Sequence, residues 1–385
     1  MIRNRPLIRI KSQTMKYLPI LVALMMSATT VSAAAKETNK STPRKTIEKT
    51  VMQQDEKLAE EAKRAIDRGL HYLRENQAED GSWSKNVGIT ALALRAFLES
   101  PRKYTEDDGA FITKPVQYVL SRVREDGAIS GEMQNLSYNT AVAITALQAT
   151  GNPKYQEAIK GGQSFLKKHL IDEGEGYSKD HKYYGGIGYG GDERPDLSNA
   201  YLALESLKAT ALDPKDPAWE KALVFINRCQ NRSESNDQTW AANDGGFTYM
   251  PGYSPHEATA SYGGMTHAGL LSLLFAGADK QDPRVQAAYD WIRNHYSVDE
   301  NPGAPNKQGL YYYYNAFAKS MYAYGEAEIT DGKGSKHNWR EDLMRKLVSL
   351  QNPDGSWVNS TTKWWEGDKN LVTAWSIIAL NLAVR

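Results

Sequence analysis

The chain has 385 residues, 24% of which are charged, and a formal net charge of +1 at pH 7. Neither sign of charge forms a long block, so the composition does not support binding to nucleic acid or a polybasic contact with a membrane. The single cysteine, Cys229, excludes an intrachain disulfide. It lies in an apolar helical stripe, which favours a small buried side chain over a nucleophile.

The first residues have the pattern of a secretory signal peptide. Basic residues between Arg3 and Lys16 precede an apolar run, and Val31-Ser-Ala33 has the small-x-small form of a cleavage site. We therefore predict a signal peptide over residues 1–33, export to the periplasm or beyond, and no transmembrane span after its removal. Translation from Met15 would give an equally good signal. Residues 34–55 lack apolar periodicity, which predicts a disordered linker before a folded domain over residues 56–385.

Six amphipathic segments alternate with six apolar segments along the rest of the chain. The first amphipathic helix is expected over Lys57–Asn76, and its partner Ile89–Leu98 is apolar nearly all round, which implies burial on several sides. The later amphipathic helices are expected to start at Ile112, Tyr155, Ala218, Pro283 and Trp339. Their apolar partners are expected over Tyr138–Thr150, Leu197–Thr210, Met265–Ala276, Tyr314–Glu326 and Asn370–Ala383. No alternating strand pattern is convincing, so we expect an all-α protein.

A heptapeptide occurs twice, inside the first and the last of these pairs. Gln77-Ala-Glu-Asp-Gly-Ser-Trp83 returns as Gln351-Asn-Pro-Asp-Gly-Ser-Trp357, and related Asp-Gly turns begin at Asp126 and Asp244. A motif that recurs in one context indicates a structural repeat. With six helix pairs it predicts an (α/α)6 toroid, whose parallel inner helices start at one end of a central cavity. An open α-solenoid is the alternative.

The pattern Gln-x-x-x-Gly-x-Trp resembles the QW repeat of squalene–hopene and oxidosqualene cyclases. Protein prenyltransferase β subunits share the (α/α)6 toroid that this resemblance implies. The resemblance covers Lys57–Arg385. In the family these repeats brace outer helices and do not touch substrate, so the resemblance indicates a fold more than a reaction.

The segment that would carry cyclase chemistry departs from the family pattern. The cyclases protonate their substrate with Asp-x-Asp-Asp-Thr-Ala, and the matching segment here is Arg194-Pro-Asp-Leu-Ser-Asn-Ala200. The two adjacent family aspartates fall on Leu197 and Ser198, or on Ser198 and Asn199. Neither a hydroxyl nor an amide is an acid strong enough to protonate an alkene. The resemblance therefore implies the fold without standard cyclase activity, and leaves open whether the protein is an enzyme.

Prenyltransferase chemistry meets a similar obstacle. The prenyltransferases hold zinc with Asp-x-Cys and a later histidine, and here Ser198 stands in place of the cysteine. Asp196 and His267 remain, two ligands where catalytic zinc usually has three. We therefore predict no metal and no cofactor.

A polar residue followed by alanine starts each apolar helix. These residues are Thr90, Thr140, Asn199, His267, Asn315 and Thr373. They would ring one mouth of the cavity in this register, and the alternative is helix capping and hydrogen bonding between helices. His267 is the only titratable member, so we predict it as a catalytic acid or base, with a buried structural histidine as the alternative.

Asp196 is the second catalytic candidate. Asp192 and Glu193 precede it, and paired carboxylates can perform glycosidase-like acid and base catalysis. The alternative for Asp196 is an N-cap role, because acids are favoured at helix starts.

Aromatic residues concentrate in the loops before the apolar helices. Such rings can stack on sugars or contact a lipid. The predicted ligand-binding residues are Tyr184, Tyr189, Asn199, Tyr262, Tyr314, Asn315, Trp364 and Trp365. We expect an aromatic cavity for a hydrophobic or extended small molecule, an isoprenoid or a glycan. A carbohydrate-active lyase or hydrolase and a non-catalytic binding or scaffold protein remain the alternatives, and the sequence does not predict an oligomeric state.

Overall fold

In the described residues, twelve α-helices alternate between two layers. The computed structural model describes residues 43–131, 135–190 and 194–385, so the predicted signal peptide lies outside the described residues. The outer helices are α1 (Pro43–Glu75), α3 (Ala110–Leu120), α5 (Gln156–Lys168), α7 (Ala218–Cys229), α9 (Pro283–Asn294) and α11 (Trp339–Leu350). The inner helices are α2 (Val87–Leu98), α4 (Leu136–Ala149), α6 (Leu197–Ala209), α8 (Gly263–Phe275), α10 (Leu310–Tyr324) and α12 (Lys369–Ala383).

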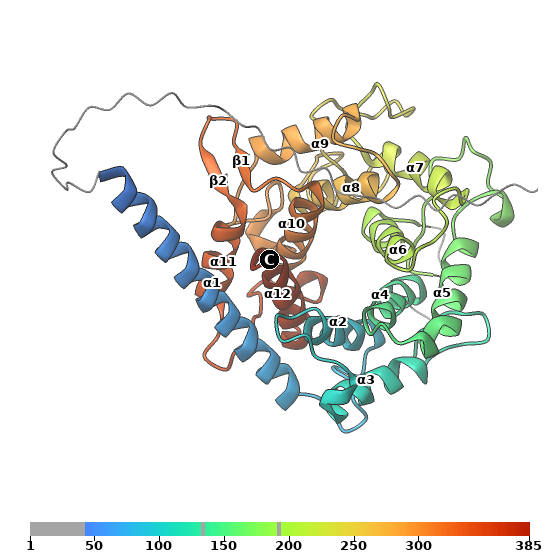
Figure 1. Ribbon diagram of the computed structural model, residues 1–385. Coiled ribbons are helices and arrows are strands. Elements are labelled where there is room, and N and C mark those ends of the chain that lie inside the picture. The colour runs from blue at the N-terminus through green and yellow to red at the C-terminus, as the bar shows by residue number, and fades with distance from the viewer. Residues whose placement is uncertain (1–42, 132–134, 191–193) are drawn as a thin grey trace, which may run out of the picture. The chain divides into compact units, whose positions relative to one another are not determined.

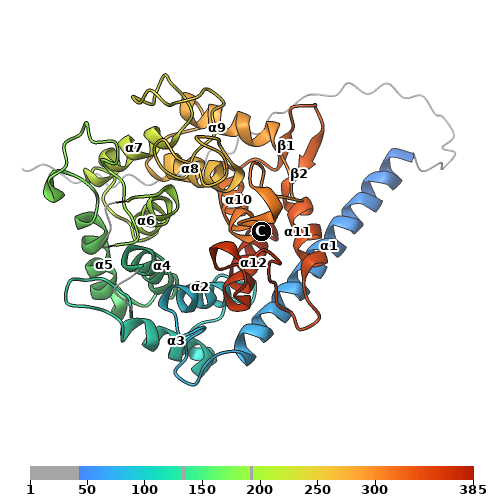
Figure 2. The same cartoon turned by 180° about the vertical axis from the view of Figure 1, so that it is seen from behind.

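The six inner helices form a closed ring within the compact unit Lys49–Arg385. Each inner helix packs on the inner helices before and after it in the chain, and α12 packs on α2. Figures 1 and 2 show this ring from opposite sides, with α3, α5, α7, α9 and α11 outside it. The predicted all-α (α/α)6 toroid is therefore confirmed, and the open solenoid is excluded because an open stack would leave α2 and α12 apart.

The burial of the two layers follows from their sequences. Helix α2 is buried at almost every position because it contacts neighbours on all sides. Helix α5 buries one stripe, Ile159, Gly162, Phe165 and Leu166, and its other residues are half-buried or exposed. Cys229 in α7 is buried, and burial raises the pKa of its thiol, as expected for a packing residue.

The twin heptapeptides bond to the outer helices α1 and α11. Both tryptophans are fully buried, and their indole N–H groups donate to backbone carbonyls near the ends of the preceding outer helices, Trp83 to Leu73 at 2.7 Å and Trp357 to Leu347 at 2.8 Å. Gln351 donates to the carbonyl oxygen of Ala65 in α1 at 2.8 Å. The last unit is thereby tied to the first outer helix, so the second heptapeptide lies at the seam of the ring.

Glycine is required in the seam turn. Gly355 has φ of +87°, and a Cβ there would lie 2.5 Å from the carbonyl oxygen of Arg68. Any other residue would be strained and would also collide with the backbone of α1. The turn therefore permits the close approach of the last unit to the first.

Threonines near the starts of four inner helices hold the same turns. The Oγ1 atoms of Thr90, Thr140, Thr266 and Thr373 accept from the backbone N–H groups of Trp83, Ile129, Phe247 and Trp357 at 3.0, 2.9, 3.1 and 3.0 Å, respectively. This bonding corresponds to the capping alternative for the polar column. In the fourth unit the role belongs to Thr266, one residue before His267.

The structure differs most from the sequence prediction at α1, at α10 and at a short hairpin. Helix α1 starts at Pro43, inside the predicted linker, and α10 starts at Leu310, earlier than the predicted Tyr314. Strands β1 (Glu328–Thr330) and β2 (Lys336–Asn338) form an antiparallel hairpin that the sequence did not predict, because three residues are too few to show alternation. In the described part of the chain, no helix combines the length and apolar character needed to cross a membrane.

Candidate functional site

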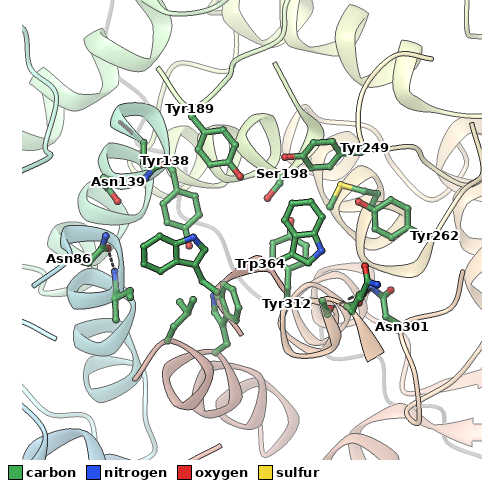
Figure 3. Close-up of a pocket in the computed structure, with 18 of the residues that line it drawn as sticks. Asn86, Tyr138, Asn139, Tyr189, Ser198, Tyr249, Tyr262, Asn301, Tyr312 and Trp364 are labelled. Atoms are coloured by element: carbon green, nitrogen blue, oxygen red, sulfur yellow. Dashed lines mark hydrogen bonds between the residues drawn. The ribbon is translucent and has the colours of Figure 1, made fainter. Parts of the chain in front are cut away.

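A cavity of about 330 Å³ lies where the inner helices start. All six inner helices contribute through a capping residue or a side chain of the first two turns. These residues are Asn86, Ile89, Asn135, Tyr138, Asn139, Ser198, Tyr262, Met265, Gly309, Tyr312, Leu371 and Trp375. Loops complete the wall with Tyr189, Tyr249, His256, Asn301, Gln308, Trp364 and Trp365. Figure 3 shows the phenol and indole rings facing one another across this space, which we call the aromatic cavity.

Several polar side chains in the wall are engaged by the protein itself. Asn86 accepts from the backbone N–H of Ile89 at 3.0 Å, and Asn301 accepts from that of Gly264 at 2.9 Å. Asn139 donates to Ser130 Oγ at 2.9 Å. The bonds of Asn86 and Asn301 satisfy backbone N–H groups that helix starts leave unpaired. The ring faces remain as contact surface, an arrangement suited to a largely apolar ligand.

A loop over residues 359–368, here called the tryptophan strap, forms one wall of the cavity. Trp364 and Trp365 have positive φ angles of 61° and 66°, a conformation that bulky residues rarely adopt. They are also 42% and 64% exposed. Asn359 donates to the carbonyl oxygen of Lys307 at 2.7 Å, and Thr361 donates to that of Asn306 at 2.6 Å. The strap is thus bound to the loop before α10 while it presents two indoles at the cavity.

Glu366 anchors the strap to α10. Its fully buried carboxylate accepts from the backbone N–H groups of Tyr311 and Tyr312, each at 2.8 Å, and from the side-chain amide of Asn359. Burial raises the pKa of Glu366 to about 7, although these hydrogen bonds oppose the shift. One carboxyl group therefore caps the helix that carries Tyr312 and fixes the loop that carries Trp364.

A second compartment of about 570 Å³ adjoins the aromatic cavity and contains Asp196 in its wall. Tyr189, Tyr249 and Trp364 belong to both walls. Asp196 is the N-cap of α6, where it accepts from the backbone N–H of Asn199 at 2.9 Å and from its side-chain amide at 2.7 Å. Burial raises the pKa of Asp196 to about 6, against the lowering effect of its hydrogen bonds with Asn199, Ser198 and Tyr249. Asp196 therefore combines the capping role with a buried position in the wall of the second compartment.

The structure brings together some of the predicted site residues. Tyr189, Tyr262, Trp364 and Trp365 all line the aromatic cavity. Asn199 is not among the residues that line either compartment, and it donates hydrogen bonds to Asp196, which lines the second one. Asp192 and Glu193, predicted near Asp196, lie outside the described residues.

Three other predicted binding residues lie away from both compartments. The hydroxyl of Tyr184 donates to Glu173 at 2.7 Å, and that of Tyr314 donates to the carbonyl oxygen of Val298 at 2.7 Å. Asn315 donates to the carbonyl oxygen of Trp375 at 3.3 Å. These side chains connect elements of the scaffold, so their contacts do not place them against a ligand.

His267 is not among the residues that line either compartment. Its side chain is 2% exposed and packs edge-on against Tyr313 and Phe317. The Nδ1 atom of the ring lies 2.6 Å from Ser320 Oγ. Burial lowers the pKa of His267 to about 3, which keeps the imidazole neutral. The contacts match the buried structural alternative. Within the described ranges, no group of three His, Cys, Asp or Glu side chains could hold a metal ion.

The cavity contains aromatic residues that the sequence analysis did not select. Tyr138 and Trp375 lie two residues from the helix-start threonines Thr140 and Thr373, a spacing that could have identified them. Tyr312 was missed because the start of α10 was placed at Tyr314. Tyr249 belongs to the same group of loop aromatic residues as Tyr189 and Tyr262, whereas His256 carries no comparable sequence signal.

Comparison with known proteins supports the fold. No family model and no curated protein sequence matches the chain. Among solved structures, a variant of the type II terpene cyclase MstE from Scytonema matches with a TM-score of 0.56 at 13% identity, over 85% of this chain and 97% of that chain. Another MstE variant, in complex with geranylgeranyl dihydroxybenzoate as substrate, matches with a TM-score of 0.54 at 13% identity, over the same shares of the two chains, 85% and 97%.

A prenyltransferase structure gives a similar match. Protein geranylgeranyltransferase-I from Candida albicans, complexed with GGPP, has a TM-score of 0.53 at 16% identity, over 82% of this chain and 90% of that chain. Matches at such low identity establish the fold alone. The chain has a helical toroid like those of terpenoid cyclases and prenyltransferases.

Proposed function

We propose that this protein binds an isoprenoid-like hydrophobic ligand in the aromatic cavity and lacks standard cyclase activity. The observation that carries the proposal is the wall itself, to which all six inner helices contribute and in which aromatic rings predominate. Asn86, Asn139 and Asn301 are engaged in protein hydrogen bonds, so a ligand meets mainly apolar surface. The neighbours with bound geranylgeranyl compounds support the choice of an isoprenoid over other apolar molecules.

The available acid argues against standard cyclisation. Asp196 is the only carboxylic acid among the described residues that line either compartment. It caps α6 and accepts hydrogen bonds from Asn199, and it lies in the neighbouring compartment. The adjacent positions are Leu197 and Ser198, which cannot supply a second carboxyl group. We therefore assign Asp196 a structural role, scaffolding of the site as the N-cap of α6.

The same observation favours an isoprenoid over a glycan. Glycosidases generally need two carboxyl groups on opposite sides of the scissile bond. The described cavity walls provide one. A carbohydrate-active enzyme remains a separate hypothesis. It would be supported if the protein released reducing ends from a polysaccharide and the variant Asp196→Asn did not.

We further propose export through the segment over residues 1–33. Its basic start, apolar run and small-x-small site support this. N-terminal sequencing of the protein recovered outside the cytoplasm tests it. A terminus that starts at Ala34 is expected, and an intact terminus would refute it.

Titration of the purified protein with farnesol tests ligand binding. Quenching of tryptophan fluorescence is expected because Trp364, Trp365 and Trp375 line the cavity. Tyr312→Ala should weaken binding about tenfold because it removes one aromatic wall. The matched control is Tyr184→Ala, since Tyr184 bonds to Glu173 away from the cavity.

The outcomes separate binding from catalysis. Equal affinity of the two variants would argue against the aromatic cavity as the binding site. Mass spectrometry of squalene and geranylgeranyl substrates after incubation should show unchanged material. A cyclised product would overturn the assignment of Asp196 to scaffolding while leaving the binding site in place.

A further inference from the structure

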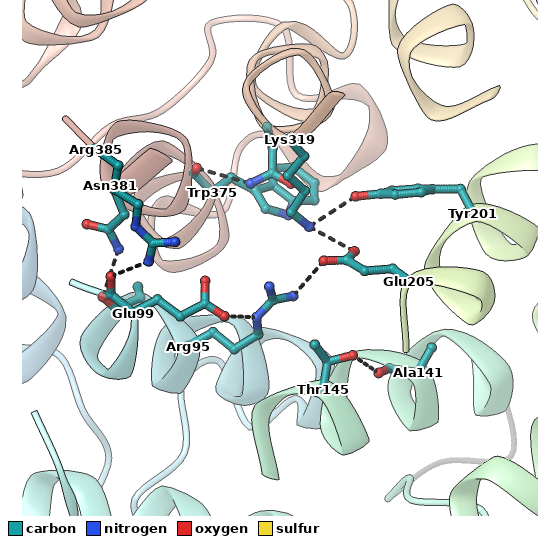
Figure 4. Close-up of polar contacts among 12 residues, drawn as sticks. Arg95, Glu99, Ala141, Thr145, Tyr201, Glu205, Lys319, Trp375, Asn381 and Arg385 are labelled. Carbon is teal, nitrogen blue, oxygen red and sulfur yellow. Dashed lines mark hydrogen bonds and ion pairs between the residues drawn. The ribbon is translucent and has the colours of Figure 1, made fainter. Parts of the chain in front are cut away.

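A cluster of charged side chains lies inside the ring of inner helices. Arg95 of α2 contacts Glu205 of α6 at 3.1 Å, and Lys319 of α10 contacts Glu205 at 2.9 Å. Lys319 also donates to the hydroxyl of Tyr201 at 3.0 Å. All four side chains are buried, and Figure 4 shows them reaching toward one another from separate helices. We call Arg95, Glu205 and Lys319 the axial cluster.

The ring order places this cluster across the lumen. Helices α2, α6 and α10 alternate around the ring, because α4, α8 and α12 stand between them. Side chains that link alternate helices have to span the space that the ring encloses. The two ion pairs therefore cross the axis and obstruct it.

The helix register gives the depth of the obstruction. Ser198 and Tyr312 line the aromatic cavity, while Glu205 and Lys319 follow them by seven residues on the same helices. Seven residues correspond to about two turns, or about 10 Å along a helix. The axial cluster thus lies about two turns below the level at which the cavity is lined.

The cluster is held in place by its charges. Burial alone would raise the pKa of Glu205, but Lys319 and Arg95 outweigh it and lower the pKa to about 2. Glu99 pairs with Arg95 at 2.7 Å from the end of α2. An apolar chain that entered the cluster would separate these buried charges, which is strongly unfavourable. The cluster therefore resists displacement by a hydrophobic ligand.

We infer that the axial cluster closes the bottom of the aromatic cavity and thereby limits the length of the apolar chain that the cavity accepts. The cavity of about 330 Å³ is at the small end of the range of roughly 300–1,000 Å³ that is usual for small-molecule pockets, so it favours a short chain over a long one. The adjoining compartment adds the charged residues Arg194 and Asp196 to an aromatic wall, so it can accept a polar end group. This inference rests on the proposed function and specifies the length of its ligand.

A length series of prenyl alcohols tests the inference. Geraniol, farnesol, geranylgeraniol and squalene, a hydrocarbon of thirty carbons, are titrated against the purified protein by tryptophan fluorescence. Farnesol should bind at least about tenfold more tightly than geranylgeraniol or squalene. In the variant Arg95→Ala/Glu205→Ala/Lys319→Ala, geranylgeraniol should gain at least about tenfold in affinity relative to farnesol.

A volume-matched variant serves as the control. Arg95→Met/Glu205→Leu/Lys319→Met removes the charges and keeps the bulk, and such apolar replacements of buried ion pairs are often tolerated. It should lose less of the preference for farnesol than the alanine variant, because the side-chain bulk remains although the charges are gone. Circular dichroism checks that both variants are folded, and if the alanine variant is not, the wild-type series decides.

The outcomes distinguish the two proposals. Wild-type binding that is independent of chain length, or a folded alanine variant with unchanged preference, would overturn the length limit and leave isoprenoid binding intact. Failure of every alcohol to bind the wild type and both variants would overturn the proposed function, and the inference with it.

Discussion

At the scale of single residues, two buried carboxyl groups combine structural and titrating roles. Glu366 accepts from the first backbone N–H groups of α10, and Asp196 caps α6. Burial raises the pKa of both, to about 7 and about 6. His267 shows the opposite case, because burial of a base lowers its pKa. Glu366 and Asp196 are buried at the helix starts that they hold. The pKa shift of all three groups follows from burial.

Glu366 should make stability depend on pH. Its pKa rises on folding from 4.5 to about 7, so its stabilising contribution is complete below pH 4.5 and is lost as the pH rises through 7. The effect is at most about 3 kcal/mol. Urea unfolding at pH 5 and pH 8 should show a larger loss for the wild type than for Glu366→Gln.

The comparison isolates Glu366 from the other titrating groups. Asp196 and His267 are unchanged in both proteins, so their contributions cancel in the difference. The variant Asp196→Asn provides a matched control. It should still lose more stability between pH 6 and pH 8 than Glu366→Gln does, because the pKa of Asp196, about 6, is lower than that of Glu366. Identical pH dependence of the wild type and Glu366→Gln would contradict the assignment.

At the scale of elements, the tryptophan strap and the inner helices together form the wall of the cavity. The helices contribute capping residues and side chains of their first two turns in a geometry fixed by ring packing, whereas the strap contributes Trp364 and Trp365 from a loop. Their positive φ angles persist because bonds to Lys307 and Asn306, and the Glu366 anchor, hold the loop. Backbone strain supported in this way is typical of functional loops.

Removal of a strap indole should separate binding from stability. Trp365 is 64% exposed, so Trp365→Ala should change the free energy of unfolding by less than about 0.5 kcal/mol. Farnesol affinity should nevertheless fall several-fold, because one wall of the cavity is lost. The matched control is Tyr322→Ala, an exposed aromatic residue of α10 outside the cavity wall, which should leave affinity unchanged. Equal effects of the two substitutions would remove the strap from the binding site.

At the scale of the whole molecule, closure of the ring determines where the sequence repeats act. The first and last units are neighbours, since α12 packs on α2 and Gln351 bonds to α1. Trp357 packs against Gly69 of α1, where a Cβ would lie 2.8 Å from its ring. The second heptapeptide therefore supports a contact between the two ends of the folded unit, and the first supports the adjoining unit.

The seam should be the most sensitive part of the ring. Trp83→Ala combined with Trp357→Ala should destabilise the protein more than Ile129→Ala combined with Phe247→Ala, which occupy equivalent turns. Replacement of a buried aromatic residue by alanine typically costs about 3–5 kcal/mol, and the indole N–H bonds to Leu73 and Leu347 add to the loss. Denaturant midpoints measure the difference, and equal shifts would refute a special role for the seam.

Local sequence patterns are sufficient to predict the helix pairs and hence the toroid. The apolar inner segments and the one-sided outer segments arise from local periodicity, and the twin heptapeptides mark their repetition. The sequence also identified Tyr189, Tyr262, Trp364 and Trp365, which stand in loops or at a helix cap where aromatic residues are concentrated.

The helical side chains that face the cavity could be identified only from the tertiary structure. Each residue turns a side chain by about 100° around a helix, so a small error in a helix start selected Tyr314 where Tyr312 lines the wall, and singled out His267 beside the bracing Thr266. The axial cluster was equally hidden, because Arg95, Glu205 and Lys319 meet only when alternate helices are brought together by closure of the ring. Local patterns specify the helices, and long-range packing specifies what they enclose.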